Sequence, residues 1–259
     1  MIENILNIAQ KAGKKILEIY KSDDFDIEIK QDNSPVTRAD LSANEIIEQE
    51  LSKISDHPIL SEEKVIDYQI RKNWNKFWLI DPLDGTKDFI AKNGQFTINI
   101  ALIENHCPVL GIIYAPALNL TYWAQKNKGA YKNGVEIFNN SNRDKLIASD
   151  SMFHSTKETM DFINKNNITE IKRYGSALKF GKLAEGEIDI YPRFNGTKEW
   201  DTASGQIILE ESGCKIIDLS TKNKMVYNKE NIKNNYFIAM REDLEIDDES
   251  NYISGRTGN

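Results

Sequence analysis

The feature that most constrains this chain is residues 77–85, where a short apolar run ends abruptly in Asp81 and a second acid, Asp84, follows three residues later. Pro82 has no backbone N–H and is expected to stop strand pairing, while Gly85 frees the backbone to turn. Two carboxylates on one tight turn repel each other unless a cation lies between them. Oxygen ligands favour Mg²⁺, Mn²⁺ or Ca²⁺ over zinc. The segment therefore predicts a strand end that binds a divalent cation, with an ordinary Asp-Pro-Gly turn as the alternative.

The composition excludes several classes of protein. Of the 259 residues, 40% are hydrophobic, which fits a soluble globular chain and not a disordered one. The longest nearly apolar stretch, residues 108–118, is too short to cross a bilayer, and residues 1–4 lack the basic start of a signal peptide. The net charge of −7 argues against binding a nucleic-acid polymer. The only cysteines, Cys107 and Cys214, have no metal-type spacing, so we expect a cytoplasmic protein.

Hydrophobic periodicity predicts an α+β organisation for the first part of the chain. Residues 2–20 have apolar positions at helical spacing, and residues 25–30 alternate like a strand. A second helix is predicted after residues 34–37, with a capping residue at its start, and its expected buried side is Leu41, Ile46, Ile47, Leu51 and Ile54. Three β-rich stretches separated by short breaks predict an antiparallel meander, at residues 96–104, 108–115 and 119–125.

The pattern changes after the polar run at residues 139–142, and we predict a subdomain boundary there. The α+β part is expected to span residues 1–140 and an α/β part residues 141–259. In the second part the predicted strands are residues 146–148, 187–191, 215–219 and 236–239. The predicted helices are residues 155–166, 175–186 and 201–212, the last of which closes with Gly213.

Two further acids complete a candidate cluster with Asp81 and Asp84. Glu62 follows a short apolar run, residues 58–60, and Asp201 opens a predicted helix. Taken alone, Glu62 would be a solvated surface acid and Asp201 a helix cap. The case for a metal site depends on the combination of all four.

Four motifs in this order resemble the inositol monophosphatase superfamily of metal-dependent, lithium-sensitive phosphatases. The resemblance runs from about residue 9 to residue 240, and its motifs are residues 34–40 with Thr37-x-x-Asp40, Ser61-Glu62-Glu63, Asp81 to Thr86, and Trp200 to Gly205. It implies an αβαβα layered sandwich of sugar-phosphatase type, with α+β and α/β halves and mixed antiparallel sheets. The implied active site lies between the halves, with Asp201 reaching across from the C-terminal part.

The resemblance also implies roles for individual residues. Two or three Mg²⁺ ions, for which Mn²⁺ can substitute, would be held by Glu62, Asp81, the Leu83 carbonyl, Asp84 and Asp201. Asp40 and Thr86 would act with Glu62 in catalysis, as a pair that orients the attacking water. The N–H groups of Gly85 and Thr86 would hold the phosphate, in keeping with anion binding at helix N-termini. Metal ions about 3.5–4 Å apart can activate water and stabilise the leaving oxygen. No covalent nucleophile is needed, and the scattered His57, His106 and His154 are predicted to be surface or packing residues.

Three segments favour one branch of that superfamily, the bacterial CysQ-type 3'(2'),5'-bisphosphate nucleotidases. They are Lys87-Asp88, residues 175–180, and residues 191–194, with Ala177 where the branch often has Ser. The resemblance implies that Gly85, Thr86, Ser176, Lys179, Arg193 and Asp201 contact the substrate. Lys and Arg supply the cations that a second phosphate requires. We therefore expect Mg²⁺-dependent hydrolysis of adenosine 3',5'-bisphosphate to AMP and phosphate, extending to 3'-phosphoadenylyl sulfate.

Several alternatives stay open at this point. Lys179 can be read as a solvated helix lysine and Arg193 as a structural ion-pair partner. An inositol monophosphatase or a broad sugar-phosphate phosphatase would share the metal chemistry. A catalytically silent regulator that binds metal or nucleotide is the alternative from another class. The sequence also leaves peripheral membrane association and the oligomeric state open.

Overall fold

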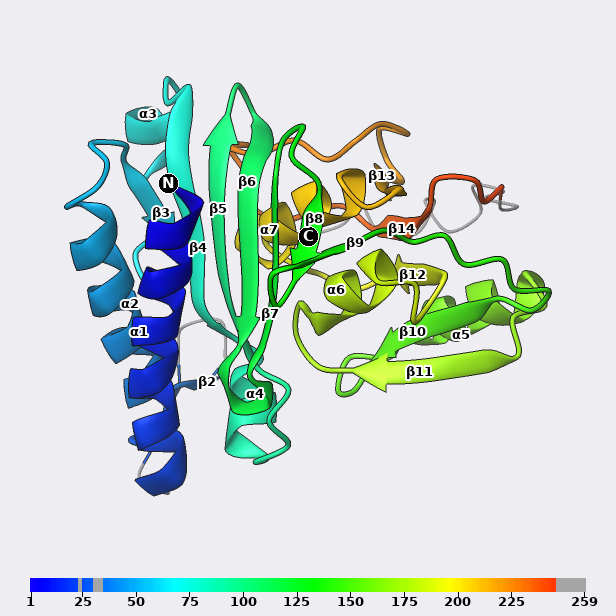
Figure 1. Ribbon diagram of the computed structural model, residues 1–259, viewed down its shortest axis with the longest axis horizontal. Helices are drawn as coiled ribbons and strands as arrows, with labels where there is room; N and C mark the ends of the chain where they lie inside the picture. Colours follow the sequence, from blue (N-terminus) through cyan, green and yellow to red (C-terminus); the bar gives the residue numbers. More distant parts are fainter. Residues whose placement is uncertain (23–24, 30–34, 246–259) are drawn as a thin grey trace.

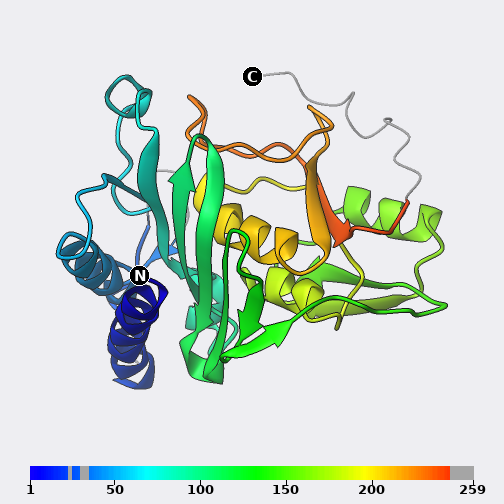
Figure 2. The same cartoon turned by 45° about the horizontal axis from the view of Figure 1, so that its top comes forward.

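Two large β-sheets alternate with three layers of helices in the computed structural model, which describes residues 1–22, 25–29 and 35–245 (Figure 1). Helices α1 and α2 cover the outer face of the first sheet, and α6 and α7 lie between the two sheets. Helix α5 covers the outer face of the second sheet. The view in Figure 2 shows α7 running between the long strands of the first sheet and the second sheet. The αβαβα layering predicted from the resemblance is confirmed.

The first sheet is mainly antiparallel. Strand β3 pairs in parallel with β4, and each later neighbour in the sheet pairs antiparallel. The predicted meander is confirmed as β5 to β7, and four further strands flank it in the sheet. In spatial order the strands are β3 (Ile59–Ser61), β4 (Lys76–Asp84), β5 (Thr97–Glu104), β6 (Cys107–Ala115), β7 (Leu120–Gln125), β8 (Ala130–Lys132) and β9 (Val135–Ile137).

The prediction that Pro82 stops strand pairing is wrong. Strand β4 continues to Asp84, which pairs with Thr97, and the register with β5 shifts between Asp81 and Asp84. Proline lacks a donor but is tolerated at such an irregularity. The shift matters for the site, because it lets one strand present both carboxylates at its end.

Two long helices cover the outer face of this sheet. Helix α1 (Ile2–Ser22) confirms the predicted first helix, and α2 (Arg38–Leu51) confirms the second. The expected buried side of α2 is partly wrong, because Leu41 is 46% exposed and Ile54 lies beyond the helix and is 38% exposed. The face that packs consists of Ala39, Asp40, Ala43, Ile47 and Leu51.

Short elements connect these layers. The predicted strand at 25–30 is reduced to β1 (Glu28–Ile29), which pairs with β2 (Pro35–Val36). Residue 30 and Ser34 of the first motif lie outside the described residues. The remaining short elements are α3 (Tyr68–Arg71), α4 (Thr86–Ile90) and the 3₁₀ helix Pro116–Leu118.

The second sheet is mixed. Strand β10 pairs in parallel with β11 and β12, whereas β14 pairs antiparallel with β12 and β13. The sequence did not predict β11, a strand with no fully buried residue. The strands are β10 (Ile147–Ser151), β11 (Glu170–Tyr174), β12 (Ile190–Arg193), β13 (Cys214–Asp218) and β14 (Phe237–Arg241), and the outer helix is α5 (Lys157–Lys165).

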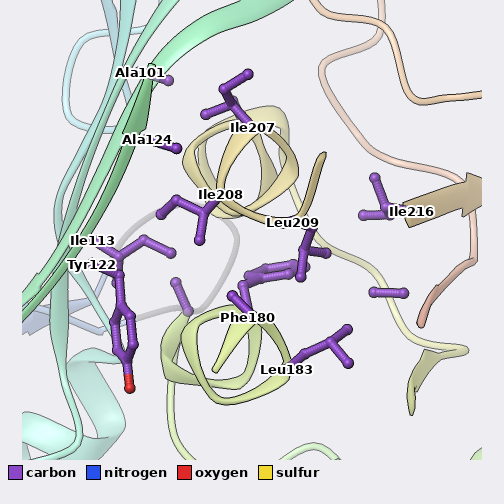
Figure 3. Close-up of a cluster of buried hydrophobic side chains, with 14 of the residues drawn as sticks. Ala101, Ile113, Tyr122, Ala124, Phe180, Leu183, Ile207, Ile208, Leu209 and Ile216 are labelled. Atoms are coloured by element: carbon purple, nitrogen blue, oxygen red, sulfur yellow. The ribbon is translucent and has the colours of Figure 1, made fainter. Parts of the chain in front are cut away.

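The central layer consists of α6 (Leu178–Ala184) and α7 (Glu199–Glu210), and the largest apolar core surrounds it (Figure 3). In Figure 3, Ile208 of α7 lies toward Ile113 of the first sheet. Leu209 of α7 and Leu183 of α6 lie on the side of Ile216, which belongs to the second sheet. The close approach of α7 to α6 depends on Gly205, since a Cβ there would lie 2.4 Å from the Phe180 ring. Helix α7 packs against strands of both sheets. The subdomain boundary near residue 140 stays a prediction.

Candidate active site

A cavity of about 380 Å³ opens where the end of β4 meets the first turns of α6 and α7. Ten of the eleven predicted site residues line it, and the eleventh, Asp40, is bonded to one of them. The ten are Glu62, Asp81, Leu83, Asp84, Gly85, Thr86, Ser176, Lys179, Arg193 and Asp201. The sequence therefore predicted which residues converge, although their roles stay predictions.

Three aspartates form the acidic wall of the cavity. One carboxylate oxygen of each of Asp81, Asp84 and Asp201 lies within 4.8 Å of the other two. Asp81 and Asp84 come from the irregular end of β4, and Asp201 comes from the first turn of α7. Strand β4 and helix α7 pack together, and this packing joins residues that are far apart in the sequence.

Each of these carboxylates also accepts a hydrogen bond from a neighbouring group of the protein. Asp81 Oδ1 accepts from the backbone N–H of Leu83 at 3.1 Å. Asp84 Oδ2 accepts from Asn99 Nδ2 at 3.2 Å. Asp201 Oδ2 accepts from the backbone N–H of Lys198 at 2.7 Å. These bonds fix the orientation of the side chains while leaving other carboxylate lone pairs for a ligand.

The electrostatics of the wall fit a bound cation. Burial raises the pKa of Asp84 to about 6, and burial together with Glu62 and Asp84 raises the pKa of Asp81 well above its usual value. Burial and then Asp84 and Glu62 raise the pKa of Asp201 in the same way. Of these acids Asp81 is buried and the other two are half-buried. Clustered acids that disfavour each other's charge are stabilised by a divalent cation, and an all-oxygen donor set suits Mg²⁺ or Mn²⁺.

Glu62 lies beside this group but is not one of the three. Its backbone N–H donates to the carbonyl of Ile80, which ties the end of β3 to β4. Its charge raises the pKa of Asp81, Asp84 and Asp201. Glu62 thus adjoins the acidic wall from the end of a second strand, β3, where it could complete the coordination of a further ion.

Asp40 and Thr86 form the contact that the resemblance implies. Thr86 Oγ1 donates to Asp40 Oδ1 at 3.2 Å. Asp40 Oδ2 accepts from Thr37 N at 2.8 Å and from Thr37 Oγ1 at 2.6 Å, which makes it the N3 partner in the capping box of α2. Burial raises the pKa of Asp40 to about 6.

The turn between the acidic wall and α4 requires glycine. Gly85 has φ +90°, in the left-handed region that other residues rarely adopt. A Cβ there would also lie 3.2 Å from both Asp88 Oδ2 and Ser176 Cβ. The turn therefore packs against the segment that starts α6, so the predicted phosphate residues adjoin the predicted nucleotide residues.

Two cationic residues, Lys179 and Arg193, also line the cavity. Lys179 is only 3% exposed, and its ammonium donates to the carbonyls of Tyr174 and Ser176 at 3.1 and 2.6 Å. Burial, and then Arg193, lowers the pKa of Lys179 to about 8, although Asp84 and Asp88 act in the opposite direction. The alternative that Lys179 is a solvated helix lysine is wrong.

Arg193 and Ser176 line the cavity together with Lys179. The Nε atom of Arg193 is buried and has no hydrogen-bond partner within the described ranges, so the guanidinium retains a donor for a ligand. Ser176 has φ +43°, and its hydroxyl donates to the carbonyl of Gln95 at 2.8 Å. Toward a ligand, the Ser176 oxygen is therefore an acceptor.

His154 is a site residue that the sequence reasoning missed. It is exposed, which agrees with the prediction of a surface or packing residue, and it also lines the cavity. Partial burial, and then the charges of Arg193, Lys87 and Lys179, lower its pKa to about 4. No motif marked it, because it lies in the irregular segment after β10, and only the packing of β10 beside β12 brings it near Arg193.

Comparison with known proteins defines the class to which this architecture belongs. The chain matches the Inositol monophosphatase family over residues 1–245. It is 40% identical over 225 residues to the 3'(2'),5'-bisphosphate nucleotidase CysQ of Buchnera aphidicola, covering 83% of each chain. It is 39% identical over 228 residues to CysQ of Escherichia coli K12, covering 86% of this chain and 92% of the relative.

Solved structures give the same result. CysQ from Bacteroides thetaiotaomicron, a bacterial member of the inositol monophosphatase family, has a TM-score of 0.84 at 38% identity, covering 93% of this chain and 96% of that one. The Thermotoga maritima IMPase has a TM-score of 0.78 at 27% identity, covering 93% and 92%. The chain belongs to the inositol monophosphatase family. Within the ranges that the structure describes, no helix is both long and apolar enough to span a membrane.

Proposed function

We propose that this chain is a Mg²⁺-dependent 3'(2'),5'-bisphosphate nucleotidase that hydrolyses adenosine 3',5'-bisphosphate to AMP and phosphate. The observation that carries the proposal is one cavity lined both by a cluster of three aspartates and by Lys179 and Arg193. Such a site can take a phosphate on the metal and a second phosphate on the cations. The names of the CysQ relatives, at 35–40% identity, support the same substrate class.

The metal would be held by Asp81, Asp84 and Asp201, with Glu62 and the Leu83 carbonyl as further ligands. When bound, Mg²⁺ would activate water and neutralise charge on the phosphate and the leaving oxygen. The number of ions, and Mn²⁺ as a substitute, belong to the proposal. The clustered carboxylates with raised pKa values support it.

Asp40 and Thr86 would orient the attacking water. Since the Thr86 hydroxyl donates its hydrogen to Asp40 Oδ1, its lone pairs are free to accept a hydrogen bond from water in the cavity. The Asp40 carboxylate in turn keeps that hydroxyl in one rotamer. The backbone N–H groups of Gly85 and Thr86 would hold the phosphate that is cleaved.

Lys179 and Arg193 would bind the second phosphate of the nucleotide. Both are charged donors on the cavity wall, and Arg193 has an uncommitted Nε. Ser176 would accept from a hydroxyl or amino group of the nucleoside, because its own proton is used by Gln95. Asp201 would also contact the substrate.

Hydrolysis of 3'-phosphoadenylyl sulfate is an extension of the same proposal, because this compound carries the same 3'-phosphate. A cytoplasmic location is also proposed, in line with the two free cysteines.

Phosphate release tests this proposal directly. Purified protein with Mg²⁺ is given adenosine 3',5'-bisphosphate, inositol 1-phosphate or fructose 1,6-bisphosphate, each with and without lithium. We expect strong preference for the nucleotide and loss of activity with lithium or a chelator. Preference for inositol or sugar phosphate would overturn the substrate assignment and retain the metal chemistry. No release from any substrate, with metal or nucleotide still bound, would favour a silent regulator.

A pair of variants tests the second-phosphate contacts. Lys179→Ala and Arg193→Ala should each raise KM for adenosine 3',5'-bisphosphate at least about tenfold more than KM for 3'-AMP. Arg173→Ala is the matched control, since its exposed side chain pairs with Asp150 and does not line the cavity. Equal effects on both substrates would refute the role of Lys179 and Arg193.

A further inference from the structure

We propose that Asn234 is a positioning residue that fixes Asp201 in the acidic cluster through the Thr197-Lys198 backbone. This inference rests on the proposed role of Asp201 as a metal ligand. Asn234 lies in the loop before β14, 24 residues beyond the end of α7 at Glu210. It is 5% exposed and does not itself line the cavity.

Helix α7 begins without an ordinary cap. Its N-cap residue is Lys198, whose side chain makes no capping hydrogen bond, so the chain before the helix needs other support. The segment 232–234 supplies it by running antiparallel to residues 197–199. The N–H of Glu199 donates to the carbonyl of Ile232 at 3.0 Å, and the N–H of Asn234 donates to the carbonyl of Thr197 at 2.8 Å.

One peptide group links this support to the acidic cluster. The carbonyl of Thr197 and the N–H of Lys198 belong to the same peptide unit and point in opposite directions. The carbonyl accepts from Asn234 N, and the N–H donates to Asp201 Oδ2 at 2.7 Å. The orientation of this peptide therefore determines where the Asp201 carboxylate is held.

The Asn234 side chain fixes the next peptide as well. Its Nδ2 lies 2.6 Å from the carbonyl oxygen of Lys198, 3.1 Å from Thr197 Oγ1 and 3.0 Å from Thr202 Oγ1. Thr202 Oγ1 donates to the carbonyl of Glu199, so toward Asn234 it acts as an acceptor. The backbone and the side chain of Asn234 together restrain the two peptide groups on either side of Lys198. The N–H of Lys198 belongs to one of these groups and holds the Asp201 carboxylate.

Substitution of Asn234 should therefore weaken metal binding. Asn234→Ala keeps the backbone bond to Thr197 but removes every side-chain bond. We expect its affinity for Mn²⁺, titrated without substrate and followed by electron paramagnetic resonance, to fall roughly tenfold, the lower end of what losing an outer partner of a ligand usually causes. Asn235→Ala is the matched control, because Asn235 bonds to Asp218 away from the cavity.

A double-mutant cycle separates positioning from general damage. Asn234→Ala placed in an Asp201→Asn background should cause no further loss of Mn²⁺ affinity, because both changes act on the same carboxylate. Additive losses would overturn the inference. Circular dichroism melts check that each variant is folded, and Asn234→Ser is read in the same way if Asn234→Ala does not fold.

The outcomes distinguish this inference from the proposed function. Normal Mn²⁺ affinity in Asn234→Ala, with weakened affinity in Asp201→Asn, would overturn the role of Asn234 and leave the metal assignment intact. Normal affinity in Asp201→Asn would overturn the metal assignment and this inference with it. Weakened affinity in both, with Asn235→Ala unchanged, is the expected result.

Discussion

Thr86 Oγ1 donates a hydrogen bond to Asp40 Oδ1 over 3.2 Å, joining the first turns of α4 and α2. The other oxygen of Asp40 accepts two bonds from Thr37. The carboxylate is thus fixed through both oxygens, and the threonine hydroxyl can face the cavity only as an acceptor. A water molecule there would donate a hydrogen bond to Thr86 Oγ1, which would hold the water in one orientation.

Thr86→Val is the sharpest test of that geometry, because valine keeps the shape and removes the hydroxyl. We expect kcat to fall about 100-fold, with KM and thermal stability nearly unchanged. Steady-state kinetics and melting curves measure these quantities. Thr221→Val, at an exposed threonine outside the cavity, is the control. A kcat within twofold of the parent would show that Thr86 does not orient the water.

Asp84→Asn should abolish turnover and stabilise the metal-free protein. The pKa of Asp84 is raised to about 6 by burial, so the folded state binds a proton more tightly than the unfolded chain. Stability contributed by this proton is lost as pH rises from about 4 through 6, and the asparagine variant avoids that loss. Urea unfolding in a chelator at pH 5 and pH 7.5 should show an advantage for the variant that grows with pH, reaching about 1 kcal/mol or more.

Addition of metal should make the parent protein more stable than Asp84→Asn. Mg²⁺ raises the unfolding free energy of the parent by binding only the folded state, and Asp84→Asn should lose most of this gain. An equal gain in the variant would argue against Asp84 as a ligand. Asp88→Asn offers a comparison, since Asp88 is a nearby buried acid outside the three-aspartate group.

Gly175→Ala should both destabilise the protein and impair substrate binding. An added Cβ would lie 2.5 Å from Asp88 Oδ1 and 2.6 Å from the carbonyl oxygen of Gln95. Overpacking of this kind costs about 1–3 kcal/mol, and relief of the clash would move Ser176. Gly134→Ala is the control, because its Cβ meets nothing within 4 Å and the cost comes only from φ +83°. Urea unfolding and KM measurements should show that only Gly175→Ala raises KM.

The sequence predicted most of the layered fold because its buried elements carry strong periodicity. The predictions that are wrong concern segments whose structure depends on contacts with distant parts of the chain. Pro82 forbids one ladder bond, yet pairing resumes at Asp84 because the register shifts beside β5. Strand β11 has no fully buried residue, so it lacks the apolar pattern of a strand and forms by pairing with β10.

The candidate site was predictable for a different reason. Asp81 and Asp84 lie three residues apart, so the sequence alone shows two carboxylates that can bind one cation. His154 and Asn234 carry no such signal, since each reaches its place through loop packing. Burial of Lys179 was also not predictable, because its surroundings come from β12 and the Tyr174 carbonyl and not from its own helix.

Lys179 should make nucleotide binding sensitive to pH on the alkaline side. Burial, and then Arg193, lowers the pKa of its ammonium group to about 8, so its charge is lost as pH rises through that value. We expect kcat/KM for adenosine 3',5'-bisphosphate to fall with an apparent pKa near 8, since this parameter reports the free enzyme. Lys179→Arg, which stays charged, should abolish the decline, and 3'-AMP should show a weaker one. A decline that persists unchanged in Lys179→Arg would assign it to another group.

Unfolding would not explain such a decline. The pKa of Lys179 is lower in the folded state than its ordinary value of 10.5, so between pH 8 and 10.5 the unfolded chain binds more protons at this site. The contribution of Lys179 to stability therefore rises with pH across that range, while the affinity for the second phosphate falls. Melting curves of the parent and of Lys179→Ala, recorded at pH 7.5 and 9.5, should show the parent regaining stability relative to the variant as kcat/KM drops. Parallel losses of stability and kcat/KM in the parent alone would instead mean that the alkaline limb reports unfolding.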